Sequence, residues 1–263
     1  MCDMAMIRYD YRSEVLELST TLTACVPDEA PPAEGYPVLY LLHGLSDDAT
    51  MWTRKTALER HLQACALPLL VVMPQAHRSY YTDEAHGIDH WTHVTAEVPA
   101  VVARTFRASA ERRDTFVAGL SMGGYGAVKW ALRAPEKFGA AASFSGALGL
   151  AQRTVDPLAA GALDGRLWDT IFDGRDVTGT EHDLLRLLES GPRAALPPLR
   201  VSCGTDDPLL AENERFIASA RRLGIDLAVD IGPGAHTWDY WDAQLQAFLA
   251  WLPAAAGSGL VNA

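Results

Sequence analysis

The sequence predicts an α/β fold, built as a mostly parallel, doubly wound sheet with helices on both faces. Short apolar, β-branched runs alternate with longer helix-like segments along most of the 263 residues, which is typical of βαβ units. Several of these runs are apolar throughout, as expected of strands buried on both faces. Hydrophobic residues make up 49% of the chain, enough for a large core. We expect a single domain over residues 1–263.

The expected strands begin with residues 13–26, whose alternating apolar and polar side chains predict an antiparallel edge strand. Residues 37–43 (PVLYLLH) form a continuous apolar run that predicts a strand buried on both faces. The remaining strands are expected at residues 69–73, 115–120, 140–144, 199–203 and 226–231.

The helices are expected between these strands, at residues 51–66, 95–108, 122–134, 211–223 and 239–252. The segment 149–198 interrupts the alternation. It is rich in Gly and Asp and has short helical patterns at residues 163–172 and 181–188. We interpret it as a cap-like insertion over one end of the sheet, and we expect the tail 254–263 to be frayed.

The overall charge argues against several classes of partner. The 22 Lys and Arg against 33 Asp and Glu give a net charge of −11, which is unfavourable for binding nucleic acid or an anionic membrane surface. The chain has neither an apolar run of about eighteen residues nor a basic then apolar N-terminus, so we expect a cytoplasmic protein without a membrane span. Its four cysteines lie far apart without a CxxC pair, which argues against a zinc knuckle or a disulfide framework.

A candidate nucleophile lies where a predicted strand meets a predicted helix. Residues 119–123 read G-x-S-x-G around Ser121. A serine exposed on such a sharp turn needs strained backbone, and bulky side chains two residues away would clash, so glycines are required there. The alternative, a glycine-rich turn with a solvated serine, is less consistent with a strand before and a helix after the motif.

A serine hydroxyl needs a histidine base and an orienting carboxylate to become a nucleophile. In doubly wound hydrolases these follow in the order Ser, Asp, His on loops after later strands. His236 lies in the loop between the last predicted strand and helix, and Asp206 and Asp207 follow the strand before it. The G-x-x-D spacing selects Asp207 as the acid, with Asp206 as the alternative, although either could cap the helix that follows.

Two backbone amides are needed to hold the oxyanion of a tetrahedral intermediate. The sequence predicts Met122, directly after the nucleophile, and Leu45, in the loop after the strand that ends in His43-Gly44. We expect His43 to have a structural role, with its ring bonded to loop backbone.

Four stretches, LLHGLSDDATMW, VAGLSMGGYGAVKWAL, CGTDDPLLAEN and GAHTWDYW, together resemble the esterase family of the α/β-hydrolase fold that includes tributyrin esterases and S-formylglutathione hydrolases (esterase D). The resemblance spans about residues 37–251. It implies a serine carboxylesterase for short acyl groups, with nucleophile Ser121, acid Asp207, base His236 and oxyanion amides Leu45 and Met122. S-formylglutathione hydrolases typically have a cysteine where this chain has Asp47 or Asp48, which argues against the glutathione thioester as substrate.

The expected activity is hydrolysis of a small-molecule ester without a cofactor or metal. S-formylglutathione hydrolysis is the first alternative, and an acyltransferase or an inactive binding module are further ones. A homodimer or homotetramer would fit the family.

Histidines and carboxylates crowd residues 77–93, but Gly87 and turn residues there favour a loop beside the site over a metal centre. The candidates for lining a substrate pocket are Trp52, Trp91, Trp168, Phe172 and Trp238. We expect Cys203 to be a small buried apolar residue.

Overall fold

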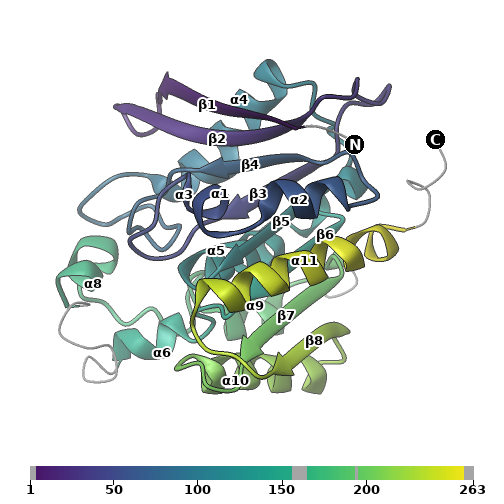
Figure 1. Ribbon diagram of the computed structural model, residues 1–263. Coiled ribbons are helices and arrows are strands. Elements are labelled where there is room, and N and C mark those ends of the chain that lie inside the picture. The colour runs from purple at the N-terminus through teal and green to yellow at the C-terminus, as the bar shows by residue number, and fades with distance from the viewer. Residues whose placement is uncertain (1–3, 156–164, 193–194, 258–263) are drawn as a thin grey trace.

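The computed structural model describes residues 4–155, 165–192 and 195–257. Eight strands form one sheet in the order β1-β2-β4-β3-β5-β6-β7-β8 (Figure 1). β2 pairs antiparallel with both β1 and β4, and every other neighbouring pair is parallel. The sheet is therefore mostly parallel, as the sequence predicted. The strands are β1 (Met4–Arg12), β2 (Ser19–Pro27), β3 (Val38–Leu42), β4 (Leu70–Pro74), β5 (Thr115–Leu120), β6 (Ala140–Phe144), β7 (Leu199–Gly204) and β8 (Leu227–Gly232).

Helices cover both faces of the sheet, and each face has its own hydrophobic core (Figure 1). α1, α2 and α11 pack on the face that receives Leu39 and Leu41 of β3, whereas α4, α5 and α10 pack on the face that receives Val38, Tyr40 and Leu42. Because both sets are buried, β3 is apolar at every position. The helices are α1 (Met51–Lys55), α2 (Leu58–Gln63), α3 (His90–Thr92), a π-helical turn η1 (His93–Glu97), α4 (Val98–Thr105), short 3₁₀ turns η2 (Arg112–Asp114) and η3 (Pro135–Lys137), α5 (Met122–Arg133), α6 (Leu150–Val155), α8 (Gly165–Phe172), α9 (Leu184–Ser190), α10 (Leu210–Arg222) and α11 (Trp238–Ala255).

The order of the strands determines where a ligand site can form. After β3 the chain moves to β4 on one side, and then returns to place β5 on the other side of β3. The loops that leave the carboxyl ends of β3 and β5 therefore diverge, and such a switch point is where open α/β sheets bind ligands. α6 and α8, which lie between β6 and β7 in the chain, are found at the same end of the sheet, whereas α9 packs against α5 and α10 on one face (Figure 1).

The predicted edge strand at residues 13–26 is wrong in its first part. The chain forms two antiparallel strands here, Met4–Arg12 and Ser19–Pro27, joined through residues 13–18. The true edge strand is β1, in which no residue is buried. An exposed edge strand carries little apolar patterning, so the sequence did not reveal it.

The predicted helix at residues 51–66 is broken into α1 and α2. Thr56 is extended, with φ −129° and ψ 169°, and its hydroxyl donates to the Trp52 carbonyl at 2.5 Å. The backbone N–H of Ala57 donates to Asp242 of α11 at 2.8 Å. These contacts replace helical hydrogen bonds at the break. The helix expected at residues 95–108 starts earlier, as α3 and η1, and ends at Thr105. The expected frayed tail lies outside the described residues from 258 onward, while α11 continues to Ala255.

Candidate active site

Ser121 lies on the turn between β5 and α5, with φ 52° and ψ −116°. A positive φ is unfavourable for a residue with a Cβ, costing on the order of 1–3 kcal/mol, and persists only where the surroundings enforce it. Both glycines of the motif are required by close packing. A Cβ on Gly119 would lie 2.4 Å from the Gly123 carbonyl oxygen, and one on Gly123 would lie 2.4 Å from that of Leu42. The turn consequently holds the Ser121 side chain at the carboxyl end of the sheet.

The structure brings His236 and Asp207 to Ser121. His236, from the loop between β8 and α11, places Nε2 3.0 Å from Ser121 Oγ. Asp207 lies in the loop after β7, and its Oδ2 and Oδ1 are 2.9 Å and 3.1 Å from His236 Nδ1. The side chain of Asp206 is exposed instead. Asp207 also accepts the Leu209 N–H at 2.8 Å, so the same carboxylate takes part in the turn before α10.

The Asp207 carboxyl is buried, yet its pKa is lowered. Burial alone raises the pKa, but the hydrogen bonds from His236 and from the Leu209 N–H outweigh this effect. The group is therefore an ionised carboxylate, which can only accept hydrogen bonds. It follows that His236 carries its proton on Nδ1, which leaves Nε2 free to accept the proton of the Ser121 hydroxyl.

The loop after β3 borders Ser121. A Cβ on Gly44 would lie 3.7 Å from Ser121 Cβ. The His43 ring accepts the Ala76 N–H at Nε2 (3.0 Å), so its Nδ1–H donates to the Gly44 carbonyl (2.8 Å). Burial lowers the pKa of His43 to about 4, which keeps the ring neutral. The prediction that His43 bonds to loop backbone is thus confirmed.

The two predicted oxyanion amides come from different segments of the chain: Leu45 lies in the loop after β3, and Met122 directly follows Ser121. The C=O and N–H of a trans peptide point in opposite directions, so the hydrogen bond to the Gly44 carbonyl also fixes the direction of the Leu45 N–H. No acceptor for this N–H is found in the described part of the chain. Met122 is the first residue of α5, where N–H groups have no acceptor within the helix.

A cavity of about 310 Å³ opens in front of these groups. Its wall combines the loops after β3, β4, β7 and β8, the turn at Ser121, the first turn of α11 and one residue of α6. The lining residues are Gly44, Leu45, Asp47, Tyr80, Leu120, Ser121, Arg153, Pro208, Leu209, His236, Trp238 and Trp241.

Comparison with known proteins identifies the family. Residues 13–252 match the family model described as "Putative esterase". The chain belongs to this esterase family. It is 26% identical to an acetyl esterase of Caldicellulosiruptor saccharolyticus over 95% of this chain and 98% of that protein. The structure is similar to that of FphF, a fluorophosphonate-binding serine hydrolase of Staphylococcus aureus (31% identity, TM-score 0.87), and to an S-formylglutathione hydrolase, FrmB, of the same organism (32%, 0.84), each over 95% of this chain and 98% of the other.

The predicted family and α/β-hydrolase fold are therefore confirmed, and this esterase is a carboxylic ester hydrolase. The sheet order, the helices on both faces and the carboxyl-end site all agree with that fold.

Of the aromatic residues predicted to line the pocket, only Trp238 does so among the described residues. Trp52 is fully buried, donates its Nε1–H to the Leu42 carbonyl at 3.1 Å and packs its ring edge-on against Trp238. Trp168 packs behind Tyr80 at a ring distance of 5.0 Å. These two tryptophans therefore support the wall from behind.

The other two aromatic candidates lie further away. Trp91 faces Lys129 and Arg133, with Lys129 Nζ 4.5 Å from its ring centre. Phe172 packs between Trp168 and His182. Trp91 therefore packs against α5, and Phe172 packs α8 against the segment before α9.

The sequence missed several residues of the wall, above all Tyr80, Arg153 and Trp241. Trp241 lies on the first turn of α11 and meets the His236 ring edge-on at 4.8 Å. Its spacing from His236 could have indicated this contact. Arg153 of α6 forms an ion pair with Glu212 of α10 at 2.7 Å. Nothing in the local pattern around Arg153 distinguishes it from a solvated arginine.

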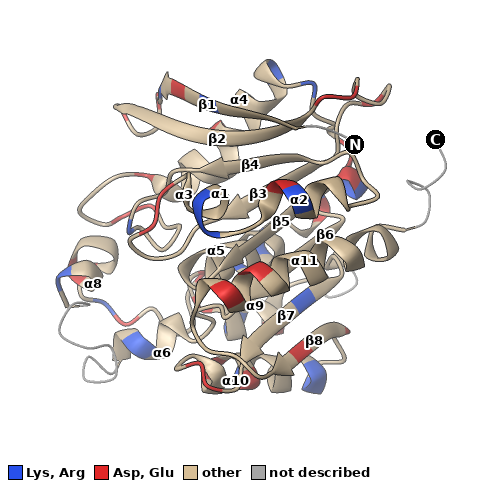
Figure 2. Cartoon of the chain, viewed as in Figure 1, with Lys and Arg blue, Asp and Glu red and all other residues tan. Residues whose placement is uncertain are grey.

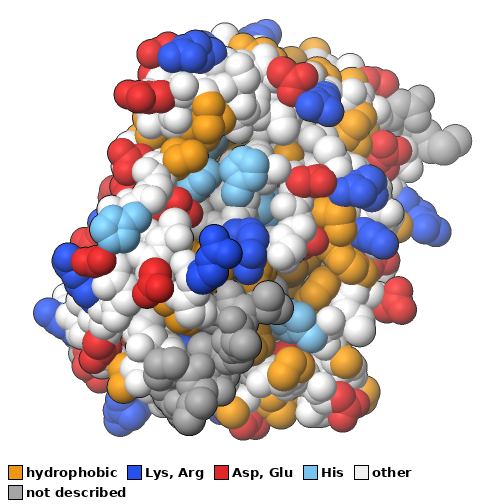
Figure 3. All heavy atoms as spheres, turned by 90° about the vertical axis from the view of Figure 1, so that its left-hand side faces the viewer, with side chains coloured by type: hydrophobic (Ala, Val, Ile, Leu, Met, Phe, Trp, Pro, Cys, Tyr) orange, Lys and Arg blue, Asp and Glu red, His pale blue; other side chains and the backbone are white. Residues whose placement is uncertain are grey.

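The histidine-rich loop at residues 77–93 forms no metal centre in the described structure, where no group of three or more His, Cys, Asp or Glu side chains is placed to hold an ion. Figure 3, which views the side that carries α6 and α8, shows histidine side chains spread across this face. His77 and His86 are exposed, whereas His90 and His93 are buried. Cys203 is fully buried, so the prediction of a small buried residue is confirmed, and burial raises the pKa of its thiol to about 12.

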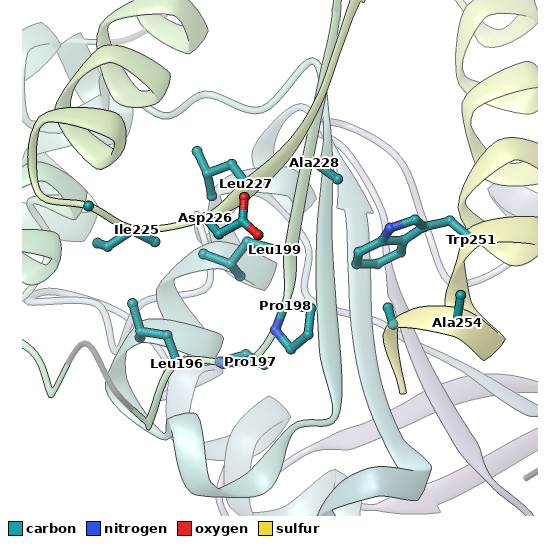
Figure 4. Close-up of a pocket in the computed structure, with 12 residues that line it drawn as sticks. Leu196, Pro197, Pro198, Leu199, Ile225, Asp226, Leu227, Ala228, Trp251 and Ala254 are labelled. Carbon is teal, nitrogen blue, oxygen red and sulfur yellow. The ribbon is translucent and has the colours of Figure 1, made fainter. Parts of the chain in front are cut away.

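A larger cavity of about 690 Å³ lies at the opposite end of the sheet (Figure 4). It is lined by the beginnings of β7 and β8 and by the end of α11, including Pro198, Asp226 and Trp251. None of the predicted site residues lies there.

Lys and Arg are interspersed with Asp and Glu over the elements in Figure 2. Across the described residues, we find no helix with the length and apolar character needed to cross a bilayer.

Proposed function

We propose that this esterase hydrolyses short-chain acyl esters through an acyl-enzyme on Ser121, with His236 as the base and Asp207 as the carboxylate that orients it. The observation that carries the proposal is the continuous line of hydrogen bonds from Ser121 Oγ through His236 to Asp207, at the wall of a cavity. Three segments far apart in the chain meet there, after β5, β7 and β8.

In the first half-reaction, His236 Nε2 takes the Ser121 proton as Oγ attacks the ester carbonyl carbon. The carbonyl oxygen becomes an oxyanion, to which the Leu45 and Met122 N–H groups donate hydrogen bonds. The intermediate then breaks its bond to the alkoxy oxygen, which receives the proton from His236 Nε2 and leaves as the alcohol. Asp207 stabilises the imidazolium while His236 holds both protons.

In the second half-reaction, water replaces the alcohol. His236 Nε2 takes a proton from the water, whose oxygen attacks the acyl carbon. The oxyanion forms at the same two amides. Its collapse breaks the bond to Ser121 Oγ, which regains its proton from His236, and the carboxylic acid is released.

The size of the cavity favours a short acyl group. Its volume of about 310 Å³ is at the lower end for ligand pockets, and its aromatic lining residues are Tyr80, Trp238 and Trp241. Arg153 of α6 also lines it, which supports a cap-like role for the segment 149–198. We expect turnover of p-nitrophenyl esters to fall steeply between butyrate and decanoate. Trp238→Ala should shift that limit to longer chains, and an unchanged chain-length profile would show that Trp238 does not set it.

S-formylglutathione hydrolysis is the second candidate. It is favoured by the 32% identity to FrmB and by Arg153 at the cavity, because glutathione carries carboxylates that a guanidinium recognises. Comparing kcat/KM for S-formylglutathione and p-nitrophenyl acetate distinguishes the two. A higher value for the thioester, reduced in Arg153→Gln, would favour this candidate.

Ser121→Ala tests the proposal. The variant should keep the native circular dichroism spectrum and melting temperature, yet lose essentially all hydrolysis of p-nitrophenyl acetate. Ser190→Ala, at an exposed position at the end of α9, is the matched control and should keep full activity. Retained turnover in Ser121→Ala would exclude Ser121 as the nucleophile.

A further inference from the structure

Lys129 is a fully buried lysine on α5, the helix that begins directly after Ser121. A lysine is almost never buried without partners, because removing its amine from water is unfavourable. Lys129 Nζ donates to the Tyr81 carbonyl at 2.9 Å and to Thr82 Oγ1 at 3.1 Å, and it lies 3.3 Å from His182 Nδ1. It therefore joins the nucleophile helix to the loop after β4 and to the loop before α9.

The Tyr80–Tyr81 turn that Lys129 holds is itself strained. Both residues have φ 49°, in the left-handed region that side chains disfavour. α5 contacts Tyr81 a second time, because a Cβ on Gly126 would lie 2.5 Å from the Tyr81 ring. The missing side chain at Gly126 admits the ring, and Lys129 fixes the carbonyl one turn further along the helix.

The Tyr81 hydroxyl reaches the proposed oxyanion loop. It donates to the His43 carbonyl at 3.0 Å, while the Gly44 N–H donates to Asp47 Oδ2 at 3.1 Å. The peptide between His43 and Gly44 is thus held on both of its sides. The next peptide carries the Leu45 N–H, and its orientation depends on this one through the Gly44 backbone.

We propose that Lys129 is a positioning residue for ester hydrolysis: by holding the Tyr80–Tyr81 turn, it keeps the Tyr81 hydroxyl on the His43 carbonyl and so keeps the Leu45 N–H aimed at the oxyanion. This inference rests on the proposed function, in which Leu45 is an oxyanion donor. Lys129 itself touches no reacting atom. Its effect is expected in the transition state, where the oxyanion exists, and so in kcat more than in KM.

The test compares Lys129→Met and Tyr81→Phe with Lys137→Met, a control at an exposed lysine. We expect kcat for p-nitrophenyl acetate to fall about ten- to hundredfold in the first two variants, as for a small misplacement of a catalytic group, with KM within about twofold of native. Because both residues act through one contact, the double variant should lose little more than the worse single variant. The control should keep native kcat and KM.

Native kcat in Tyr81→Phe, a loss expressed in KM alone, or losses that multiply fully in the double variant would each overturn the positioning role. Tyr81→Phe decides the matter alone if Lys129→Met does not fold. Ser121→Ala separates the two proposals: if it is inactive while Tyr81→Phe and Lys129→Met keep native kcat, only the role of Lys129 fails, whereas activity in Ser121→Ala removes the proposed function itself.

Discussion

Replacing Asp207 by asparagine exchanges one carboxylate oxygen for an NH₂ group. This change should move the proton of His236 from Nδ1 to Nε2. In the native enzyme Asp207 Oδ1 accepts the Leu209 N–H at 2.8 Å, and Oδ2 accepts from His236 Nδ1 at 2.9 Å. The Leu209 N–H requires an acceptor, so the asparagine carbonyl should take the Oδ1 place and its NH₂ the Oδ2 place. That NH₂ can only donate, which forces Nδ1 to accept and moves the histidine proton to Nε2.

With its proton on Nε2, His236 cannot accept the proton of Ser121. The geometry of the site is preserved, but the base is in the wrong tautomer, a change that lowers kcat by about 10⁴ in serine hydrolases of this kind. This corresponds to about 5.5 kcal/mol in the activation free energy. Initial rates with p-nitrophenyl acetate measure the loss.

Asp206→Asn is the matched control for Asp207→Asn, because it makes the same chemical change at the neighbouring exposed carboxylate. It should keep kcat within about twofold of native, since Asp206 lies outside the hydrogen-bonded line. If Asp207→Asn retained more than about a tenth of native kcat, or if the two variants lost equal activity, Asp207 would not be the orienting carboxylate.

Gly44→Ala should lower kcat by about 10²–10³ in the same assay. Its Cβ would lie 2.5 Å from Leu120 Cδ1 and 2.9 Å from Asp47 Oδ2, so the Asp47 carboxylate that accepts the Gly44 N–H must shift, and the adjoining Leu45 amide is expected to lose its alignment. Activity within threefold of native would contradict this. Lys129 should make stability depend on pH, because burial lowers its pKa from the usual 10.5 to about 7. The unfolded chain then binds one more proton between these values, so the free energy of unfolding should rise with pH relative to that of Lys129→Met, by up to about 1.4 kcal/mol per pH unit. Guanidinium unfolding at pH 7 and 9.5 measures the difference, and a difference that stays constant with pH would refute the assignment. The titratable and charged groups near Lys129 are Asp83, Arg133, Glu181 and His182.

The strands in the interior of the sheet could be predicted to within about two residues because their environment is uniform. β3, β4 and β6 are buried at every position, and apart from Ser143 in β6 all of their residues are apolar. β1 was missed because it has no buried residue. The break between α1 and α2 was missed because it depends on Asp242, which lies far away in the sequence. Local patterns cannot contain that information.

The same distinction applies to the site. Ser121, Asp207 and His236 could be named because the doubly wound hydrolase fold places the three groups on successive loops in a fixed order along the chain. The wall of the cavity could not, because Tyr80 reaches it only through a left-handed turn supported by Lys129 from another element. Large aromatic residues were expected to line the cavity, but Trp52 and Trp168 fill the layer behind it.

The identity of the nucleophile can be measured directly by the mass of the enzyme after reaction with a fluorophosphonate, followed by peptide mapping. We predict one adduct per chain, on the peptide that contains Ser121, with no adduct in Ser121→Ala and much slower labelling in His236→Ala. An adduct on another residue, or equal labelling of Ser121→Ala, would contradict the proposed mechanism.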